Sequence, residues 1–235
     1  MAATDRFIDI LRAGPTDRRC VFNPWTDHDE RDRAPRRGMP ALRVANMVAY
    51  LDARRRSARV MLLGEAPSHR GCRFTGIAFC SEVELAHKGD LVARDRLPLT
   101  SRDSAARPMR ERSAAIIWDE LEHAGCSREV VLWNAFPWHP YRAPAQAGEA
   151  TVGPCGPGSN RKPRLKEVEQ GRGALAAMLH CFTHPLEIFA VGKVAEEALG
   201  RWEEVRCAGY IRHPAQGGES RFRAQFRSLV ASKFR

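Results

Sequence analysis

Short apolar runs rich in β-branched and aromatic residues alternate with helical patterns along most of the chain, and this alternation constrains the fold more than any other feature. Four runs have the character of buried strands: RVMLLG at 59–64, EVVLWN at 129–134, LEIFAV at 186–191 and, more weakly, EVRCAGYI at 204–211. Strands that alternate with helices form parallel sheets covered on both faces. We therefore predict an α/β fold: a three-layer α/β/α sandwich around a central, mostly four-stranded parallel sheet.

Helical periodicity appears between and after these runs. The segments that carry it are 41–56, 110–125, 165–182, 192–200 and 219–234. Gly125 is placed as a helix C-cap. Two long irregular stretches, 82–109 and 137–163, interrupt the pattern, and long loops of this kind are often functional. We find no internal repeat and no clear linker, so we expect one domain over residues 1–235.

Composition places the chain among globular proteins. It has 235 residues, of which 43% are hydrophobic and 28% charged. A chain of this size buries about 68–75% of its unfolded surface, so it needs no disulfide or metal to stabilise its core. No run approaches the ~18 apolar residues of a membrane span. The first residues include Asp5 and Asp9 where a signal peptide has an uninterrupted apolar core, so we expect a cytoplasmic protein without a membrane partner.

The seven cysteines form no CxxC pair. An odd number without paired spacing favours reduced thiols that serve mainly as packing groups. A metal or iron–sulfur site assembled from scattered cysteines is the alternative.

The formal net charge of +10 favours a polyanionic partner, above all nucleic acid. Arginine-rich clusters strengthen this expectation: RDRAPRR at 31–37, ARRRSAR at 53–59, NRKPRLK at 160–166 and SRFRAQFR at 220–227. Their alternative role is that of solvated faces. The sequence does not say whether the clusters share one surface.

Three of the predicted strands are followed by an unusual motif directly after their carboxyl ends. GEAPSH follows the first strand at 64–69, NAFPWHP the second at 134–140, and RHPAQGG the fourth at 212–218. The carboxyl ends of parallel strands meet at one edge of the sheet, where α/β proteins bind ligands. The first motif continues through a Gly-rich, basic loop to GIAF at 76–79. These segments bring backbone amides, a carboxylate and an aromatic ring to the mouth of the sheet, which suits a small flat ligand.

Together, GEAPSHRGCRFTGIAF, WNAFPWHP and IRHPAQGG resemble the motifs of the uracil-DNA glycosylase superfamily, in the same order and at fitting distances. The GEAP form and SNRKP are similar to a bacterial and archaeal branch whose best-known members carry an iron–sulfur cluster. The resemblance implies a DNA repair glycosylase that flips uracil out of DNA, hydrolyses its N-glycosidic bond and leaves an abasic site. Its partner is then uracil-containing DNA, single- or double-stranded, and monomers are usual in the superfamily.

The resemblance also implies residue roles. Phe79 would stack on the flipped base, Asn134 would read its amide edge, and His213 would donate to the carbonyl oxygen that becomes negative as the bond breaks. The implied catalytic residues are Glu65, Asn134 and His213, and the implied substrate-binding residues are Gly64, Ala66, Pro67, Ser68, Phe79 and Asn134. The candidate DNA-binding residues are His69, Arg73, Gly217, Gly218, Ser220 and Arg221. Physics favours these roles, because base–aromatic stacking contributes about 1–3 kcal/mol and a positioned donor stabilises a developing anion.

The chain departs from the superfamily pattern in several places. Ala66 replaces an Asp or Asn that orients water, and Ser68 replaces a Tyr that excludes the methyl group of thymine. The cluster cysteines are missing, since only Cys20 occupies the early region, so we expect no iron–sulfur centre, no metal and no other cofactor. The loop after His213 lacks a bulky apolar wedge. Arg221 or Phe222 could substitute for the wedge, or Gly217 and Gly218 could allow close approach to phosphate.

Other interpretations stay open. A non-catalytic binder of uracil-containing or damaged DNA would use the same pocket, and Ala66 favours it. A nucleotide- or phosphate-binding enzyme is the third class, although the chain lacks GxxxxGK[ST] and GxGxxG. Covalent attachment through a loop histidine is disfavoured, because GSNRKPRLK contains none. Structural roles are the alternatives for the motif residues: core packing for Phe79, a loop cap for Asn134, a turn for His213 and an ion pair for Glu65. Trp138 and His139 either contact DNA phosphate or pack.

Overall fold

The computed structural model describes residues 2–15, 18–93, 97–143 and 155–234. Four parallel strands form the central sheet in the order β3-β2-β5-β6. Their bounds are Val60–Gly64 for β2, Val130–Asn134 for β3, Glu187–Val191 for β5 and Cys207–Ile211 for β6. The four predicted strands and the α/β fold class are therefore confirmed. A separate antiparallel pair joins the two-residue strands β1 (Val21–Phe22) and β4 (His139–Pro140).

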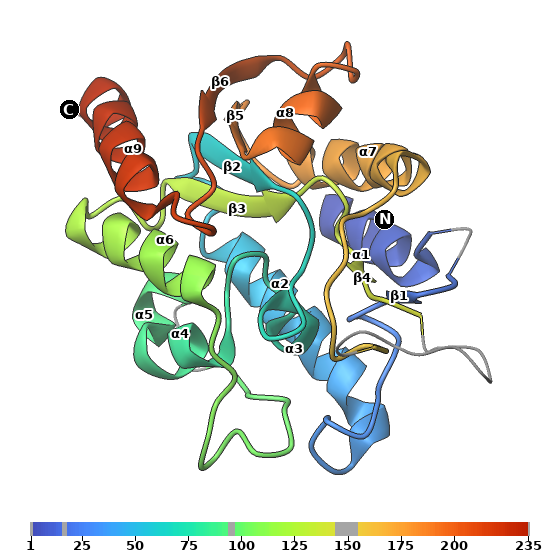
Figure 1. Ribbon diagram of the computed structural model, residues 1–235. Coiled ribbons are helices and arrows are strands. Elements are labelled where there is room, and N and C mark those ends of the chain that lie inside the picture. Colours follow the sequence, from blue (N-terminus) through green and yellow to red (C-terminus); the bar gives the residue numbers. More distant parts are fainter. Residues whose placement is uncertain (1, 16–17, 94–96, 144–154, 235) are drawn as a thin grey trace.

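The strand order determines which face of the sheet each helix covers. The chain steps from β2 to β3 in one direction and then crosses back over β2 to β5 and on to β6. Crossovers between parallel strands are right-handed, so a reversal of direction puts the connecting helices on opposite faces. Figure 1 shows α6 and α9 on one side of the sheet and α1, α7 and α8 on the other. Their bounds are Ala3–Ala13 for α1, Arg112–His123 for α6, Leu165–Leu179 for α7, Lys193–Leu199 for α8 and Glu219–Lys233 for α9.

Both faces of the sheet are covered, which explains the continuous apolar strands. Every residue of β2 and β3 is buried. Trp133 of β3 meets Phe7 of α1, with the ring centroids 5.4 Å apart. Helix α1 was not among the predicted helices. It buries Phe7, Ile8 and Leu11 and packs against α7.

Helix α2 (Met39–Asp52) covers the open edge of β3. The backbone N–H of Leu132 donates to the Tyr50 hydroxyl over 2.7 Å, and Arg54 donates to the carbonyl of Val130 over 3.0 Å. These bonds satisfy backbone groups that an edge strand leaves unpaired. The Arg54 side chain is fully buried. The cluster at 53–59 is therefore not a uniform surface cluster, because one of its arginines belongs to the core.

The irregular stretches contain short elements. Residues 82–109 include α4 (Glu82–His87) and α5 (Gly89–Val92), preceded by α3 (Cys72–Thr75), and η1 (Arg36–Gly38) precedes α2. In the second stretch, residues 144–154 lie outside the described part of the chain. Gly125 has φ +65° just after α6, as its predicted capping role requires. No described helix is both long and apolar enough to cross a membrane.

Candidate active site

A cavity of about 640 Å³ lies at the carboxyl edge of the sheet. Its walls come from the segments after β2, β5 and β6, from the start of α6 and from the loop before α7. Strand order reverses between β2 and β5, and α/β sheets bind ligands outside such a switch point. Among the predicted site residues, the cavity is lined by Glu65, Ala66, Pro67, Ser68, His69 and His213. The fold thus joins the motifs that follow β2 and β6.

Phe79 lies against the end of β2, beside Asn134. A Cβ atom on Gly64 would come within 2.1 Å of the Phe79 ring and 3.1 Å of Asn134 Oδ1, so only glycine leaves room for this arrangement. Phe79 adopts φ +49° and accepts a hydrogen bond at its carbonyl from Trp118 Nε1 over 2.9 Å. A left-handed phenylalanine is uncommon and needs such support. Gly64 and helix α6 together hold the ring in place.

β3 ends at Asn134, whose side-chain amide has no hydrogen-bond partner among the described residues. Beyond the strand ends, Ala135 N–H donates to the Gly64 carbonyl and Phe136 N–H to the Glu65 carbonyl, over 2.8 and 3.0 Å. The Asn134 side chain makes no hydrogen bond to any described residue. A loop-capping role therefore has no support. The amide offers both a donor and an acceptor to a ligand.

His213 is held as a neutral hydrogen-bond donor. Its Nδ1 accepts a bond from the backbone N–H of Ala215 over 3.1 Å, which leaves the proton on Nε2. Burial, assisted by neighbouring Arg212, lowers the pKa of His213 to about 4. The His213 and Phe79 ring centroids are 6.0 Å apart. Gly192 has φ +89°, and a Cβ atom added to it would lie only 3.1 Å from the Cβ of His213. The glycine therefore leaves room for the histidine.

Two carboxylates line the cavity, Glu65 and Glu111. Burial raises the pKa of Glu65, against the opposing charge of Lys162. Burial also raises the pKa of Glu111, to about 7, although a hydrogen bond from Ser68 opposes the change. Ser68 Oγ donates to Glu111 Oε2 over 2.7 Å.

Sequence reasoning missed Glu111. It stands at the N-cap of α6, just after an irregular stretch, and no motif marks it. Its carboxylate occupies the space above Gly71, where a Cβ would come within 1.7 Å of Oε2. Gly71, the glycine after GEAPSHR, leaves room for the Glu111 carboxylate. The sequence alone does not show this, because Glu111 lies in a distant part of the chain.

Basic side chains dominate the remaining rim of the cavity. They are Arg70, Arg110, Arg112, Arg161, Lys162, Lys193 and Arg212. Asn160 joins the loop before α7 to the first motif, because its Oδ1 accepts a bond from the His69 backbone N–H over 2.8 Å. Arg161 is bound to Glu167 over 2.6 Å. A cationic rim around a small cavity is suited to a ligand that carries phosphates.

Trp138 and His139 pack and do not face DNA. Both are buried. Trp138 Nε1 donates to the Leu11 carbonyl over 2.9 Å. The two ring nitrogens of His139 lie 2.9 Å from the Pro67 carbonyl and 3.1 Å from the Pro157 carbonyl. His139 thereby joins the two loops that carry Ser68 and Asn160.

The prediction that Arg73 contacts DNA is wrong. Its side chain is fully buried, ion-paired with Asp29 and stacked between the rings of Phe22 and Phe74 at 4.6 and 4.5 Å. A guanidinium without solvent access does not reach a phosphate. Its role is to join the segment after β1 to α3.

The other predicted DNA-binding residues lie outside the cavity, apart from His69. Gly217, Ser220 and Arg221 are near the start of α9, and Arg221 is exposed. A Cβ on Gly218 would come within 2.0 Å of the His213 carbonyl. The glycine at 218 is therefore required by the turn that carries His213, and phosphate approach does not explain it.

The described residues contain no group of three or more His, Cys, Asp or Glu side chains arranged to hold a metal. Cys72, Cys80, Cys126 and Cys181 are buried, and Cys155 and Cys207 are exposed. The described cysteines, including the half-buried Cys20, are therefore not gathered as the ligands of a cluster would be.

Residues 52–231 match the family model described as "Uracil DNA glycosylase superfamily". The chain belongs to this superfamily. The matched range contains all three motifs, and membership supports the class of DNA glycosylase hydrolases.

Among solved structures, the chain is similar to the crystal structure of wild-type SMUG2 from Pedobacter heparinus. The TM-score is 0.66 at 15% identity, over 99% of this chain and 98% of that one, which supports the shared fold. No curated protein sequence matches significantly.

Proposed function

We propose that the protein removes uracil from DNA by flipping the nucleotide into the cavity and hydrolysing its N-glycosidic bond. One observation carries the proposal: His213 lines the cavity with its Nε2–H free to donate, the buried Phe79 ring lies 6.0 Å behind it, and the Asn134 amide, without a partner among the described residues, stands beside that ring at the end of β3. Superfamily membership supplies the reaction class, and the choice of uracil rests on this geometry and on the motif resemblance.

Phe79 and Asn134 would bind the flipped base. A base within a duplex is out of reach of catalytic groups, so the nucleotide has to leave the stack. The Phe79 ring offers a face for stacking. The Asn134 amide can donate to one polar atom of the uracil edge and accept from another.

His213 would stabilise the leaving base. As the C1′–N1 bond breaks, its electron pair moves onto uracil and charge develops on a carbonyl oxygen. The neutral Nε2–H is a donor for that oxygen, and loss of one such donor in a measured hydrolase costs about 2.7–4 kcal/mol. Water then adds to C1′ of the sugar and gives up one proton.

A carboxylate at the cavity would take that proton, because Ala66 has no group for the task. Glu65 is the residue implied by the resemblance. We choose Glu111 instead, because it lines the same cavity and its raised pKa of about 7 suits a general base. The products are an abasic site and free uracil. Turnover by a cytoplasmic monomer, on single- or double-stranded DNA, belongs to the same proposal.

A non-catalytic binder is the second candidate, favoured by Ala66. The test is alkali-labile cleavage of a labelled single-stranded oligonucleotide with one uracil, beside thymine and hypoxanthine controls. We expect cleavage at uracil, and a reduction of about 10²–10³-fold in His213→Ala. His184→Ala is the matched control, because His184 is exposed and near the opposite edge of the sheet. Binding without any cleavage would show the binder instead.

A further inference from the structure

Two arginine-rich segments far apart in the sequence form one surface. Residues 31–33 and 100–102 are joined by backbone hydrogen bonds, from Arg33 N–H to the Thr100 carbonyl over 2.8 Å and from Arg102 N–H to the Arg31 carbonyl over 2.7 Å. Asp32 and Ser101 form an antiparallel bridge between them. Figure 1 shows both segments at the bottom of the view. We name residues 30–37 and 100–112 together the basic lobe.

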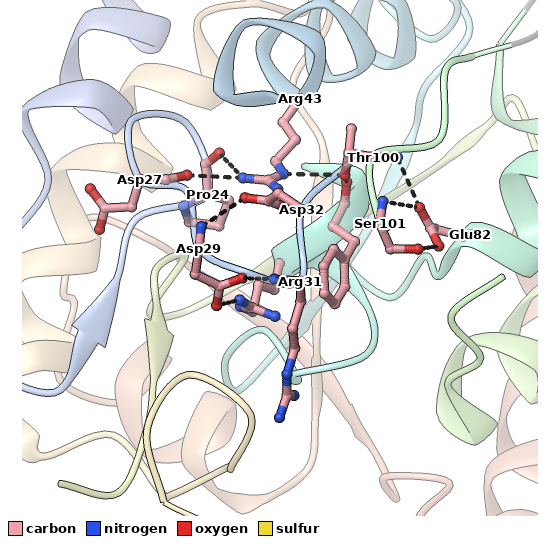
Figure 2. Close-up of polar contacts among 11 residues, drawn as sticks. Pro24, Asp27, Asp29, Arg31, Asp32, Arg43, Glu82, Thr100 and Ser101 are labelled. Atoms are coloured by element: carbon pink, nitrogen blue, oxygen red, sulfur yellow. Dashed lines mark hydrogen bonds and ion pairs between the residues drawn. The ribbon is translucent and has the colours of Figure 1, made fainter. Parts of the chain in front are cut away.

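A buried polar network holds the basic lobe to the rest of the fold (Figure 2). Arg43 of α2 is fully buried, pairs with Asp32, and donates to the Asp27 carbonyl over 3.0 Å and to Thr100 Oγ1 over 3.4 Å. On the other side, Glu82 accepts the backbone N–H groups of Thr100 and Ser101, both over 2.8 Å. Charges buried in this way are stable only when their hydrogen bonds are made. The network therefore fixes the two backbones relative to each other.

The surface of the basic lobe is strongly cationic. Its exposed arginines are Arg33, Arg36, Arg37, Arg102, Arg107, Arg110 and Arg112, and its exposed acids are Glu30 and Asp103. Arg102 pairs with Asp103 and Arg112 with Glu219. In the described chain, the other five arginines have no ion-pair partner. Like charges held together on a fixed backbone repel, and a polyanion relieves that repulsion.

The basic lobe is continuous with the rim of the cavity. Arg110 and Arg112 belong to both. The Arg31 guanidinium lies against Gly158, where a Cβ would come within 2.2 Å of Nη2. Gly158 is in the loop that carries Asn160 and Lys162. A nucleic-acid strand with one nucleotide in the cavity can therefore continue along the basic lobe with cationic side chains beside its phosphates throughout.

We infer that the basic lobe binds the DNA backbone beyond the flipped nucleotide. The inference rests on the proposed function for its choice of DNA as the partner. It extends the footprint from the cavity to the surface over η1 and the 100–112 segment.

The test compares two triple variants that remove the same charge. One carries Arg33→Gln, Arg36→Gln and Arg37→Gln in the basic lobe. The control carries Arg6→Gln, Arg12→Gln and Arg201→Gln, exposed arginines of α1 and the α8 end. Affinity for a uracil-free duplex longer than the cavity is measured against salt concentration. Each phosphate that a side chain no longer neutralises lowers the slope of log K against log salt by about 0.9. We expect a shallower slope and weaker binding in the lobe variant alone.

Equal slopes in both variants, or no duplex binding by the wild type, would overturn the inference. Uracil-free DNA needs no catalysis, so an inactive protein would still report on the basic lobe. Excision of uracil from a short oligonucleotide serves as the second readout. The lobe variant should retain the wild-type rate there, and a lower rate would contradict the inference by placing these arginines in the cavity's own machinery.

Discussion

His213 and Glu111 face the same cavity, and burial moves their pKa values in opposite directions. Burial disfavours the charged form of each group. It lowers the pKa of His213 to about 4 and raises that of Glu111 to about 7. At neutral pH the histidine is an uncharged donor, while the carboxyl group is divided between its two forms. A proton acceptor with a pKa near the working pH is the most effective general base.

We therefore expect the excision rate to fall about tenfold per pH unit below pH 7, because a base must be ionised to take the proton from water. His213 adds nothing to this change, since it stays neutral down to about pH 4. Glu111→Gln should lower the rate and flatten the profile, while Glu65→Gln should leave its shape. Single-turnover rates between about pH 5 and pH 9 provide the measurement. A flat profile in Glu65→Gln with an unchanged one in Glu111→Gln would assign the base to Glu65.

Other charged groups near Glu111 set the background of this titration. From α4, Glu84 raises its pKa further. The charge of Glu111 also acts on the Cys72 thiol of α3. Burial raises the pKa of Cys72 far above the pH range of the measurement, so this thiol does not titrate within it. The remaining charged or titratable groups that line the cavity are Glu65, His69, Arg70, Arg110, Arg112, Arg161, Lys162, Lys193, Arg212 and His213.

At the scale of elements, α7 packs closely against the chain at the end of β3. Gly171 of α7 faces the chain just after Asn134, and a Cβ there would come within 1.7 Å of the Ala135 carbonyl oxygen. Two positions on, Gly173 is exposed with nothing within 4 Å of its Cβ position. The helix thus contains one glycine that packing requires and one that it does not.

Substitution of these glycines should have opposite effects. Gly173→Ala should stabilise the protein by about 0.5–1 kcal/mol, because alanine is the better helix former. Gly171→Ala should destabilise it by about 1–3 kcal/mol, since the methyl group meets backbone that does not yield easily. Urea unfolding measures both free energies. Similar stabilisation by the two substitutions would contradict the close approach of α7.

At the scale of the whole molecule, buried arginines join irregular segments to α2 and to the sheet. Arg43 and Arg54, both of them fully buried, reach carbonyl groups in segments far away in sequence. These bonds compensate the cost of burying a guanidinium. The irregular segments that these arginines contact are therefore stabilised by polar contacts as well as by the hydrophobic core.

Arg43→Met should destabilise the protein by about 3–5 kcal/mol, because it leaves Asp32 buried without its partner. The double variant with Asp32→Asn should recover part of that stability, since no charge is then left uncompensated. Arg172→Met is the matched control. Its pair with Glu204 is about half exposed, and exposed pairs contribute about 0–1 kcal/mol. Chemical unfolding of the wild type and the three variants measures these differences, and equal destabilisation by Arg43→Met and Arg172→Met would contradict the buried network.

Local sequence patterns are enough to predict the four strands, most of the long helices and the motifs at the strand exits. These features are local: strand and helix periodicity, and glycine where the chain turns, are written within a few residues. Helix α1 is not predicted, because its apolar stripe of Phe7, Ile8 and Leu11 is short. The resemblance of the motifs then led to the superfamily that the family model supports.

Which polar side chains meet depends on the tertiary structure. Ser68 and Glu111 are 43 positions apart, and Arg73 and Asp29 are 44 apart. Whether an arginine faces DNA or is buried under a loop depends on such distant partners, which no local pattern encodes. For that reason the sequence predicts a surface position for Arg73, does not indicate Glu111, and does not join the two halves of the basic lobe.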